Sequence, residues 1–276
     1  MPPLSSRQRR RRRLPVAALV LVALVVIVVV VLSGGATPST GFDVSYPQCA
    51  GDLPSAPLFG VVGVNAGRAN TTNPCLGTEL GWAQGAPGQR SPTQPRVSLY
   101  INTGNPGGHH VSDFPHTGTA PGYGACTGRL TDACSYLYGQ QRARHSFVLV
   151  AAHAPALARR APWWLDVELL STWAGTYQLN VAALRGFVAG LQRSGARGPV
   201  GIYSTAAQWK DITGLSAQST SRAFHAMLPD WVAGTVASLA QARTNCVAGG
   251  FTGAPPVLAQ YRLGPRDADL RCPGTA

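Results

Sequence analysis

Two carboxylates lie two residues apart in a stretch that is otherwise apolar and aromatic, Trp163-Trp164-Leu165-Asp166-Val167-Glu168. Only 12% of the residues are charged, so acidic side chains are scarce in this chain. Alternate side chains of a β-strand point to the same face, which would bring Asp166 and Glu168 together. Half-buried acids cost free energy through desolvation and mutual repulsion, and such pairs are typical of acid/base sites. The alternative is a structural pair that faces arginines.

Short apolar runs bounded by Gly, Pro or Asn predict the strands that would carry these acids. They cover residues 59–65, 97–102, 163–169, 200–204, 231–233 and 257–261. Helical patterns lie between them. Asn180 is expected to cap a helix over residues 181–193 that Gly195 closes. Residues 145–159 fit a second helix, although 147–150 fit a strand equally well, and residues 104–125 predict a long surface loop. Strand–helix alternation of this kind predicts a single α/β domain, a (β/α) barrel of TIM type.

Functional groups of such barrels gather at the carboxyl ends of the strands. Polar residues end the predicted runs of this chain at that point: Asp43, Ser45, Asn65, Asn102, Asp166, Glu168, Ser204 and Gln260. Because they come from strands far apart in sequence, they predict one polar site at this rim of the barrel.

The N-terminus carries a targeting signal. Arg7 and Arg9 through Arg13 precede an uncharged run of 18 residues from Pro15 to Leu32. A helix of that length spans roughly 27 Å, close to the thickness of a hydrocarbon core. The length favours an uncleaved transmembrane anchor over a signal peptide, and the arginines predict a cytoplasmic N-terminus. We therefore expect a cytoplasmic segment 1–13, an anchor or signal peptide 14–32, a linker 33–40 and an extracytoplasmic domain 41–276.

The net charge of +12 overstates how basic that domain is. Six arginines precede the apolar run and all 11 acids follow it, so the rest of the chain carries only +6. Its basic residues are scattered, which argues against nucleic-acid binding. His109, His110 and His116 could suggest a metal site, but their spacing does not supply a set of three ligands, so we expect no metal. We also expect no cofactor.

Six cysteines in an exported domain predict disulfides. Fifteen pairings are open in principle. Proximity in sequence favours Cys49–Cys75, Cys126–Cys134 and Cys246–Cys272.

Several short stretches, in this order, resemble glycoside hydrolase family 25 lysozymes. They are Gly41-Phe42-Asp43-Val44-Ser45, Trp164-Leu165-Asp166-Val167-Glu168, Val200-Gly201-Ile202-Tyr203-Ser204, Asp230-Trp231-Val232-Ala233-Gly234 and Gln260-Tyr261 with Asp269-Leu270. The stretches Val64-Asn65-Ala66-Gly67-Arg68 and Tyr100-Ile101-Asn102-Thr103-Gly104-Asn105-Pro106-Gly107, and the closing Asp269 to Cys272, are similar to the exported bacterial "glycoside-hydrolase-like" branch of that family. The resemblance covers residues 41–272.

The resemblance implies a (β/α)5β3 barrel with a muramidase-type site. In that site Glu168 would be the general acid, and Asp43 and Asp166 would assist it. A late aspartate would correspond to Asp269, with Asp267 as the alternative. We expect substrate contacts from Tyr46, Asn65, Asn102, Tyr203, Gln260 and Tyr261, and packing roles for Trp164 and Trp209.

The resulting hypothesis is an enzyme of the bacterial cell envelope that hydrolyses β-1,4-linked amino-sugar polymer, with peptidoglycan as the expected partner. The rival is a non-catalytic module of the same shape that binds wall glycan or serves envelope assembly. A hydrolase for a different envelope polysaccharide is a third hypothesis.

Overall fold

The computed structural model describes residues 40–90, 96–107 and 111–275. The expected cytoplasmic segment 1–13, the apolar segment 14–32 and all of the linker except Thr40 lie outside these residues. Among the helices that the structure describes, none is both long and apolar enough to cross a bilayer.

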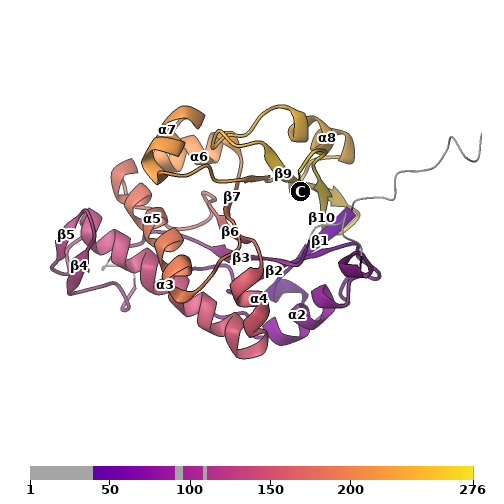
Figure 1. Ribbon diagram of the computed structural model, residues 1–276, viewed down its shortest axis with the longest axis horizontal. Helices are drawn as coiled ribbons and strands as arrows, with labels where there is room; N and C mark the ends of the chain where they lie inside the picture. The colour runs from indigo at the N-terminus through magenta and orange to yellow at the C-terminus, as the bar shows by residue number, and fades with distance from the viewer. Residues whose placement is uncertain (1–39, 91–95, 108–110, 276) are drawn as a thin grey trace, which may run out of the picture. The chain divides into compact units, whose positions relative to one another are not determined.

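Eight strands close into a barrel in the order β1-β10-β9-β8-β7-β6-β3-β2 (Figure 1). Their bounds are β1 Thr40–Val44, β2 Gly60–Gly63, β3 Ser98–Asn102, β6 Trp163–Asp166, β7 Val200–Ser204, β8 Asp230–Val232, β9 Pro256–Leu263 and β10 Arg266–Arg271. Strand pairing is parallel from β1 through β2, β3, β6, β7 and β8 to β9. β10 runs antiparallel to both of its neighbours, β9 and β1. The prediction of a (β/α) barrel is confirmed.

The α-helices surround the barrel and follow five of its strands (Figure 1). They are α2 Leu76–Gln84 after β2, α3 Asp132–His153 and α4 Pro155–Arg160 after β3, α5 Tyr177–Ser194 after β6, α6 Ala206–Thr213 and α7 Ala217–Phe224 after β7, and α8 Leu239–Val247 after β8. β1 is followed instead by the short 3-10 helix η1 (Tyr46–Gln48), and a second one, η2, spans Pro87–Arg90. In the described residues, three barrel strands therefore lack a following α-helix.

The period of two along each strand divides the apolar core into an inner and an outer part. Inside the barrel, the Trp231 ring contacts the rings of Tyr100, Trp164 and Tyr203 at centroid distances of 6.0, 5.9 and 4.3 Å. Outside, the alternate residues of the strands pack against the helices. The aromatic cluster fills the middle of the barrel, so only its rim is open to a ligand.

Two helix predictions need correction. α5 begins at Tyr177 rather than at residue 181, and its N-cap residue is Thr176 rather than Asn180. The Asn180 amide instead cross-links the chain, donating to the carbonyl oxygens of Ala174 and Ile212. Gly195 does end the helix in a left-handed conformation, with φ of 107°. Residues 145–153 belong to α3, so the strand alternative for 147–150 is wrong.

The expected surface loop 104–125 is only partly a loop. It contains a hairpin of β4 (Gly118–Ala120) and β5 (Gly124–Cys126). Phe114 and Ala120 are buried because this segment packs against α3. The hairpin segment therefore adds to the outer core. His109 and His110 of the predicted loop lie outside the described residues.

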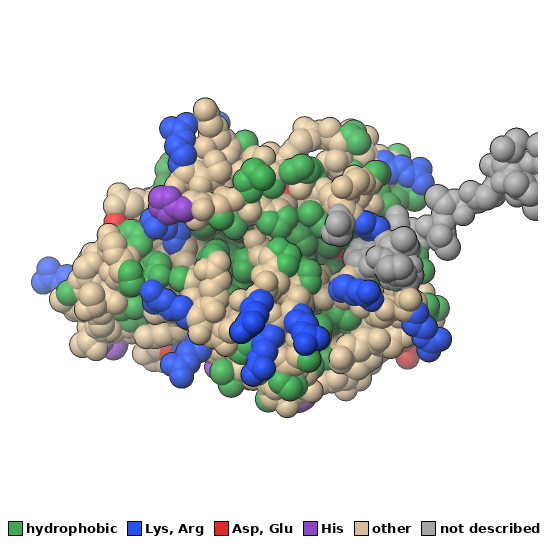
Figure 2. All heavy atoms as spheres, viewed as in Figure 1, with side chains coloured by type: hydrophobic (Ala, Val, Ile, Leu, Met, Phe, Trp, Pro, Cys, Tyr) green, Lys and Arg blue, Asp and Glu red, His purple; other side chains and the backbone are tan. Residues whose placement is uncertain are grey.

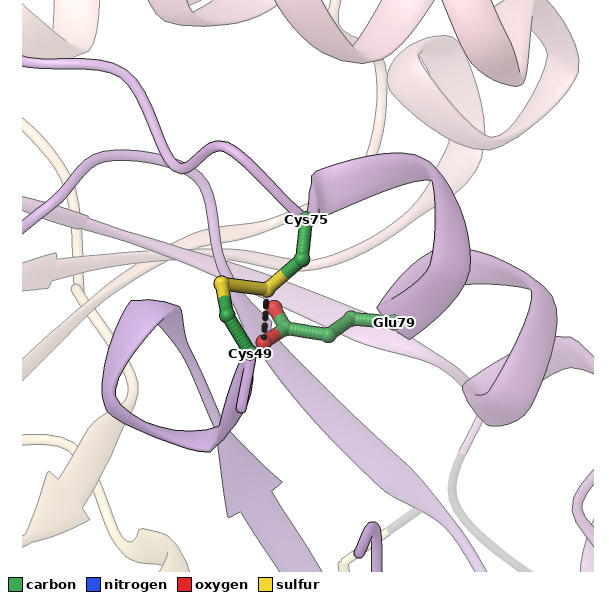
Figure 3. A group of neighbouring side chains, drawn as sticks. All are labelled: Cys49, Cys75 and Glu79. Carbon is green, nitrogen blue, oxygen red and sulfur yellow. Dashed lines mark hydrogen bonds between the residues drawn. A yellow bond between two sulfur atoms is a disulfide. The ribbon is translucent and has the colours of Figure 1, made fainter. Parts of the chain in front are cut away.

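The three predicted disulfides are confirmed: Cys49–Cys75, Cys126–Cys134 and Cys246–Cys272. The first joins the residue after η1 to the residue before α2, and it lies next to the Glu79 side chain (Figure 3). The second bridge joins β5 to α3, and the third joins α8 to the residue after β10.

Acidic side chains are sparse on the face shown in Figure 2, where lysine and arginine side chains are spread over the surface. Part of the reason is burial, since Glu79, Asp166, Asp230 and Asp269 are all at most 5% exposed. Four of the eleven acids of this chain are thus buried.

Candidate active site

A cavity of about 460 Å³ opens at the carboxyl ends of the parallel strands. Its lining combines four acids with aromatic and amide side chains and contains neither lysine nor arginine among the described residues. The acids are Asp43, Asp166, Glu168 and Asp267. The rim site predicted from the strand ends is therefore a real depression that is rich in carboxylates.

Asp166 ends β6 and is almost completely buried, with 5% of its surface exposed. The Asn102 side-chain amide donates a hydrogen bond to Asp166 Oδ2, while Asp166 Oδ1 has no partner among the residues that the structure describes. Burial raises the pKa of Asp166 well above its ordinary value, and the nearby charge of Glu168 adds to the rise. A buried, unpartnered oxygen in this lining is free to contact a ligand or water.

Glu168 lies two residues beyond the end of β6, so the two acids do not share a strand as expected. The backbone nevertheless stays fixed, because Val167 N donates to Tyr203 O and Ser204 Oγ donates to Val167 O, at 2.9 and 2.7 Å. Half-buried, Glu168 has a pKa raised by burial, and a 3.4 Å hydrogen bond from Gln208 Nε2 opposes that rise. A raised pKa lets Glu168 keep its proton to a higher pH than an ordinary glutamate, as a general acid needs.

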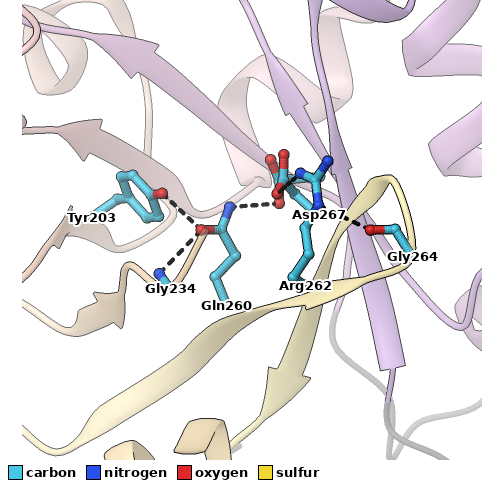
Figure 4. A network of polar contacts seen from close by, with 7 residues as sticks. Tyr203, Gly234, Gln260, Arg262, Gly264 and Asp267 are labelled. Atoms are coloured by element: carbon cyan, nitrogen blue, oxygen red, sulfur yellow. Dashed lines mark hydrogen bonds and ion pairs between the residues drawn. The ribbon is translucent and has the colours of Figure 1, made fainter. Parts of the chain in front are cut away.

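Asp43 lies on β1 and contacts Gln260, whose contacts with Tyr203 and Gly234 are shown in Figure 4. Gln260 Nε2 donates to Asp43 Oδ2 at 2.9 Å, and Gln260 Oε1 accepts from Tyr203 Oη and Gly234 N at 2.9 and 3.1 Å. Burial raises the pKa of Asp43 to about 7, and the charge of Asp267 adds to this. The contacts fix the amide orientation of Gln260, so its nitrogen faces the carboxylate.

The two candidates for the late aspartate occupy different places on β10. Asp269 is fully buried, and its Oδ1 accepts a 2.8 Å hydrogen bond from Trp231 Nε1. Burial, and then the charge of Asp43, raise the pKa of Asp269 well above its ordinary value. Asp267 lines the cavity and forms a 2.8 Å ion pair with Arg262 (Figure 4). The structure thus brings Asp267, the second choice from the sequence, to the cavity surface.

Four of the six expected substrate-binding residues line the cavity: Tyr46, Asn102, Tyr203 and Gln260. Asn65 does not, because its side chain pairs with the backbone of Asn102 at 2.8 and 3.1 Å and braces β3. Tyr261 packs outside the barrel with Ala242 of α8, since it follows the inward-facing Gln260 and must point the other way. Trp164 and Trp209 are buried, as expected for packing residues.

Two of the residues missed from the sequence bear on the acids. Tyr100 lines the cavity beside Trp231, and Gln208 of α6 contacts Glu168. The position of Tyr100, two residues before Asn102 on one strand, was a usable signal for the same face. Nothing in the sequence connects Gln208 to Glu168, because a helix that follows a different strand carries it.

One group of side chains in the described residues has metal-ligating atoms within 4.8 Å of one another: Cys49, Cys75 and Glu79 (Figure 3). Its two sulfurs form a disulfide and so offer no thiolate to a metal ion. The group also lies outside the cavity lining.

No family model matches the chain. A segment of 51 residues is 45% identical to the probable GH family 25 lysozyme 4 of Dictyostelium discoideum. The segment is 18% of this chain and spans only 22% of that protein's length.

Solved structures give similar neighbours at low identity. The lysozyme from Streptomyces coelicolor has a TM-score of 0.49 at 16% identity, covering 87% of this chain and 94% of that one. The muramidase from Trichobolus zukalii has a TM-score of 0.45 at 14% identity, covering 84% and 92%. The modular Cpl-1 endolysin, complexed with a peptidoglycan analogue, has a TM-score of 0.45 at 14% identity, covering 85% and 54%.

The matched segment and the closed mixed barrel agree with the resemblance seen in the sequence motifs, and the described residues fit a glycoside hydrolase family 25-like domain.

Proposed function

We propose that this chain is an exported glycoside hydrolase that cleaves a β-1,4-linked amino-sugar polymer of the cell wall, peptidoglycan in the first place. The observation that carries the proposal is the convergence of Asp43, Asp166 and Glu168 from two distant parts of the sequence in one cavity. Their hydrogen-bond donors are amides rather than arginines, which argues against a purely structural ion-pair cluster.

Glu168 is the general acid in this proposal. Glycosidic cleavage needs a proton on the leaving oxygen and stabilisation of an oxocarbenium-like centre. A raised pKa keeps Glu168 protonated at a higher pH than an ordinary glutamate, so it has a proton to give. Burial favours the neutral forms of Asp43 and Asp166, but the positive charge that develops on the sugar favours their ionised forms. Once ionised, they stabilise the sugar cation and orient the attacking group.

For the late aspartate we favour Asp267 as the group that meets the substrate, because it lines the cavity. Asp269 is buried behind Trp231, and the charge of Asp43 influences its pKa. We therefore assign Asp269 a supporting role, in which it influences the charge of Asp43 without touching the substrate. Tyr46 is 44% exposed at the cavity wall, which suits a ring that stacks on a sugar.

Export by the N-terminal segment completes the proposal. The arginines and the apolar run would direct residues 41–276 out of the cytoplasm, either tethered or released after cleavage. Three disulfides in the folded domain support an oxidising compartment.

The test is digestion of purified peptidoglycan by the full chain, followed through the release of reducing ends. We expect Glu168→Gln to lower the rate by at least about a hundredfold, the usual effect of losing a general acid, while glycan binding persists. Asp52→Asn is the matched control, because Asp52 is an exposed acid outside the cavity.

Each other outcome identifies a different function. Binding of peptidoglycan by both proteins without cleavage by either would overturn the hydrolase and favour a wall-binding module. Cleavage of another envelope polysaccharide, with the same dependence on Glu168, would move the proposal to that substrate.

A further inference from the structure

A buried carboxyl group touches one of the three disulfides, away from the cavity. Glu79 lies in the first turn of α2 and is 1% exposed. Its Oε1 is 3.1 Å from the Sγ atom of Cys75, which lies immediately before that helix (Figure 3). The proposed glycan chemistry does not use this acid. Burying a carboxyl group costs free energy, so its position calls for an explanation.

The surrounding hydrogen bonds determine which oxygen of Glu79 carries the proton. Asn73 is oriented by two backbone groups, since its Nδ2 donates to Gly63 O and its Oδ1 accepts from Cys75 N, at 2.7 and 3.1 Å. The same Nδ2 donates to Glu79 Oε2 at 2.6 Å. Because Oε2 is an acceptor there, the proton of the neutral acid lies on Oε1, which faces the Cys75 sulfur.

The two ends of this bridge differ in access. Cys49 is exposed and Cys75 half-buried. The Cys126–Cys134 bridge is buried at both ends, and Cys272 of the third bridge is 1% exposed. Within the described chain, neither of these two bridges has a carboxyl oxygen at hydrogen-bonding distance from a sulfur. An incoming thiolate can therefore reach Cys49, and the sulfur that leaves is the one beside Glu79.

We propose that Cys49–Cys75 is an exchangeable redox disulfide in which Glu79 donates the proton to the departing Cys75 sulfur. The reductant is a dithiol. Its thiolate attacks Cys49 Sγ, the Cys49–Cys75 bond breaks, and Cys75 leaves with the proton from Glu79 Oε1. The second thiol of the reductant then attacks the mixed disulfide and releases Cys49 as a thiolate, which takes up a proton. Two electrons pass to the protein, the dithiol becomes a disulfide, and solvent reprotonates Glu79.

Exchange at this bridge would act on the cavity wall. Cys49 directly follows η1, and all three residues of η1 line the cavity. With the bridge open, this wall keeps the hydrogen bond from Ser45 N to Gln48 Oε1 at 2.8 Å but loses its covalent tie to α2. The redox state of the surroundings would thereby control how firmly Tyr46 is held against a ligand.

The test measures how fast dithiothreitol reduces each bridge of the full chain, using thiol alkylation and peptide mass spectrometry. We expect Cys49–Cys75 to open at least about tenfold faster than Cys246–Cys272, and Glu79→Gln to remove most of that advantage by removing a general acid. Reduction of Cys246–Cys272 in the same sample is the internal control. Equal rates for the two bridges in the wild-type chain would overturn the proposal.

A pH profile of the wild-type protein tests the same point without a substitution. Burial raises the pKa of Glu79 to about 7, against the hydrogen bond from Asn73. The rate per thiolate ion should therefore fall by about tenfold from pH 6 to pH 8 at Cys49–Cys75 and stay constant at Cys246–Cys272. A flat profile at Cys49–Cys75 would show that Glu79 does not supply the proton.

Discussion

Three of the four cavity acids accept a hydrogen bond from an amide side chain, whereas Asp267 pairs with Arg262. Asn102 donates to Asp166, Gln260 to Asp43 and Gln208 to Glu168. A neutral donor lowers the pKa of a buried acid less than an arginine would, so the group can still change its protonation state. Amide partners therefore suit acids that must exchange protons, whereas arginine partners would suit permanent charges.

Replacement of Asn102 tests this at the residue scale. Asn102→Ala removes the donor to Asp166 Oδ2, and the pKa of that buried acid should rise further. If ionised Asp166 supports cleavage, the acidic limb of the pH–activity profile moves to higher pH, and the rate at pH 6 falls by about tenfold or more. Asn245→Ala on α8, away from the cavity, is the control. An unshifted acidic limb in Asn102→Ala would remove Asp166 from the mechanism.

At the scale of elements, the placement of the strands depends on how closely α3 and α5 approach. Both helices carry glycine at the crossing. A Cβ atom on Gly186 would lie 2.0 Å from Tyr136 O, and one on Gly139 would lie 2.0 Å from Ala183 O. The glycines are needed for space rather than for conformation, since the two helices nearly touch through their backbones. Because α5 directly follows the loop that contains Glu168, the same contact also fixes the point at which that loop ends.

Alanine at this crossing should therefore destabilise the protein, although alanine favours helices. For Gly186→Ala we expect a loss of about 2 kcal/mol or more in the free energy of unfolding, because overpacking outweighs a helix-propensity gain of about 1 kcal/mol. Gly81→Ala in α2 is the matched control, since nothing lies within 4 Å of its added Cβ, and it should be neutral or stabilising. Urea denaturation of both variants measures the difference, and equal stabilities would contradict the close packing.

For the whole molecule, the buried acids determine how stability depends on pH. Burial raises the pKa of both Glu79 and Asp230 to about 7. Their ordinary values are lower, so the folded state binds more protons than the unfolded state between about pH 4 and pH 7. The stabilisation from these groups is complete below the unfolded pKa values and is lost as the pH rises toward 7. The domain should be more stable at pH 5 than at pH 8.

Asp230→Asn separates one contribution to this pH dependence. Asp230 is fully buried, and its Oδ2 accepts from Thr252 N at 3.1 Å, a bond that the amide oxygen of Asn can keep. Without a titrating group there, the difference in unfolding free energy between pH 5 and pH 8 should shrink by about 2 to 3 kcal/mol. Thermal melts at the two pH values give the result, with Asp52→Asn as the control. An unchanged difference would show that Asp230 titrates as in the unfolded chain.

Part of this molecule follows from local sequence alone. The apolar runs gave six barrel strands, because buried parallel strands need near-continuous apolar residues. Polar residues in these runs predicted the rim positions of Asp166 and Glu168, whereas the role of Asp43 came from the family resemblance. The nearest-neighbour pairing of the cysteines was correct. These features depend on residues close together in sequence, where alternation and chain length leave few choices.

Contacts between distant segments decided the rest. Alternation says that Gln260 and Tyr261 face opposite ways, but only barrel closure determines that Gln260 points inward. The antiparallel register of β10 against β1 pairs Gly41 with Asp269, which buries that acid and leaves Asp267 at the cavity. The Cys49–Cys75 disulfide beside Glu79 likewise requires the start of α2 to meet the end of η1. Sequence determines which side chains share a face; the register between strands and helices far apart in the chain determines which faces meet.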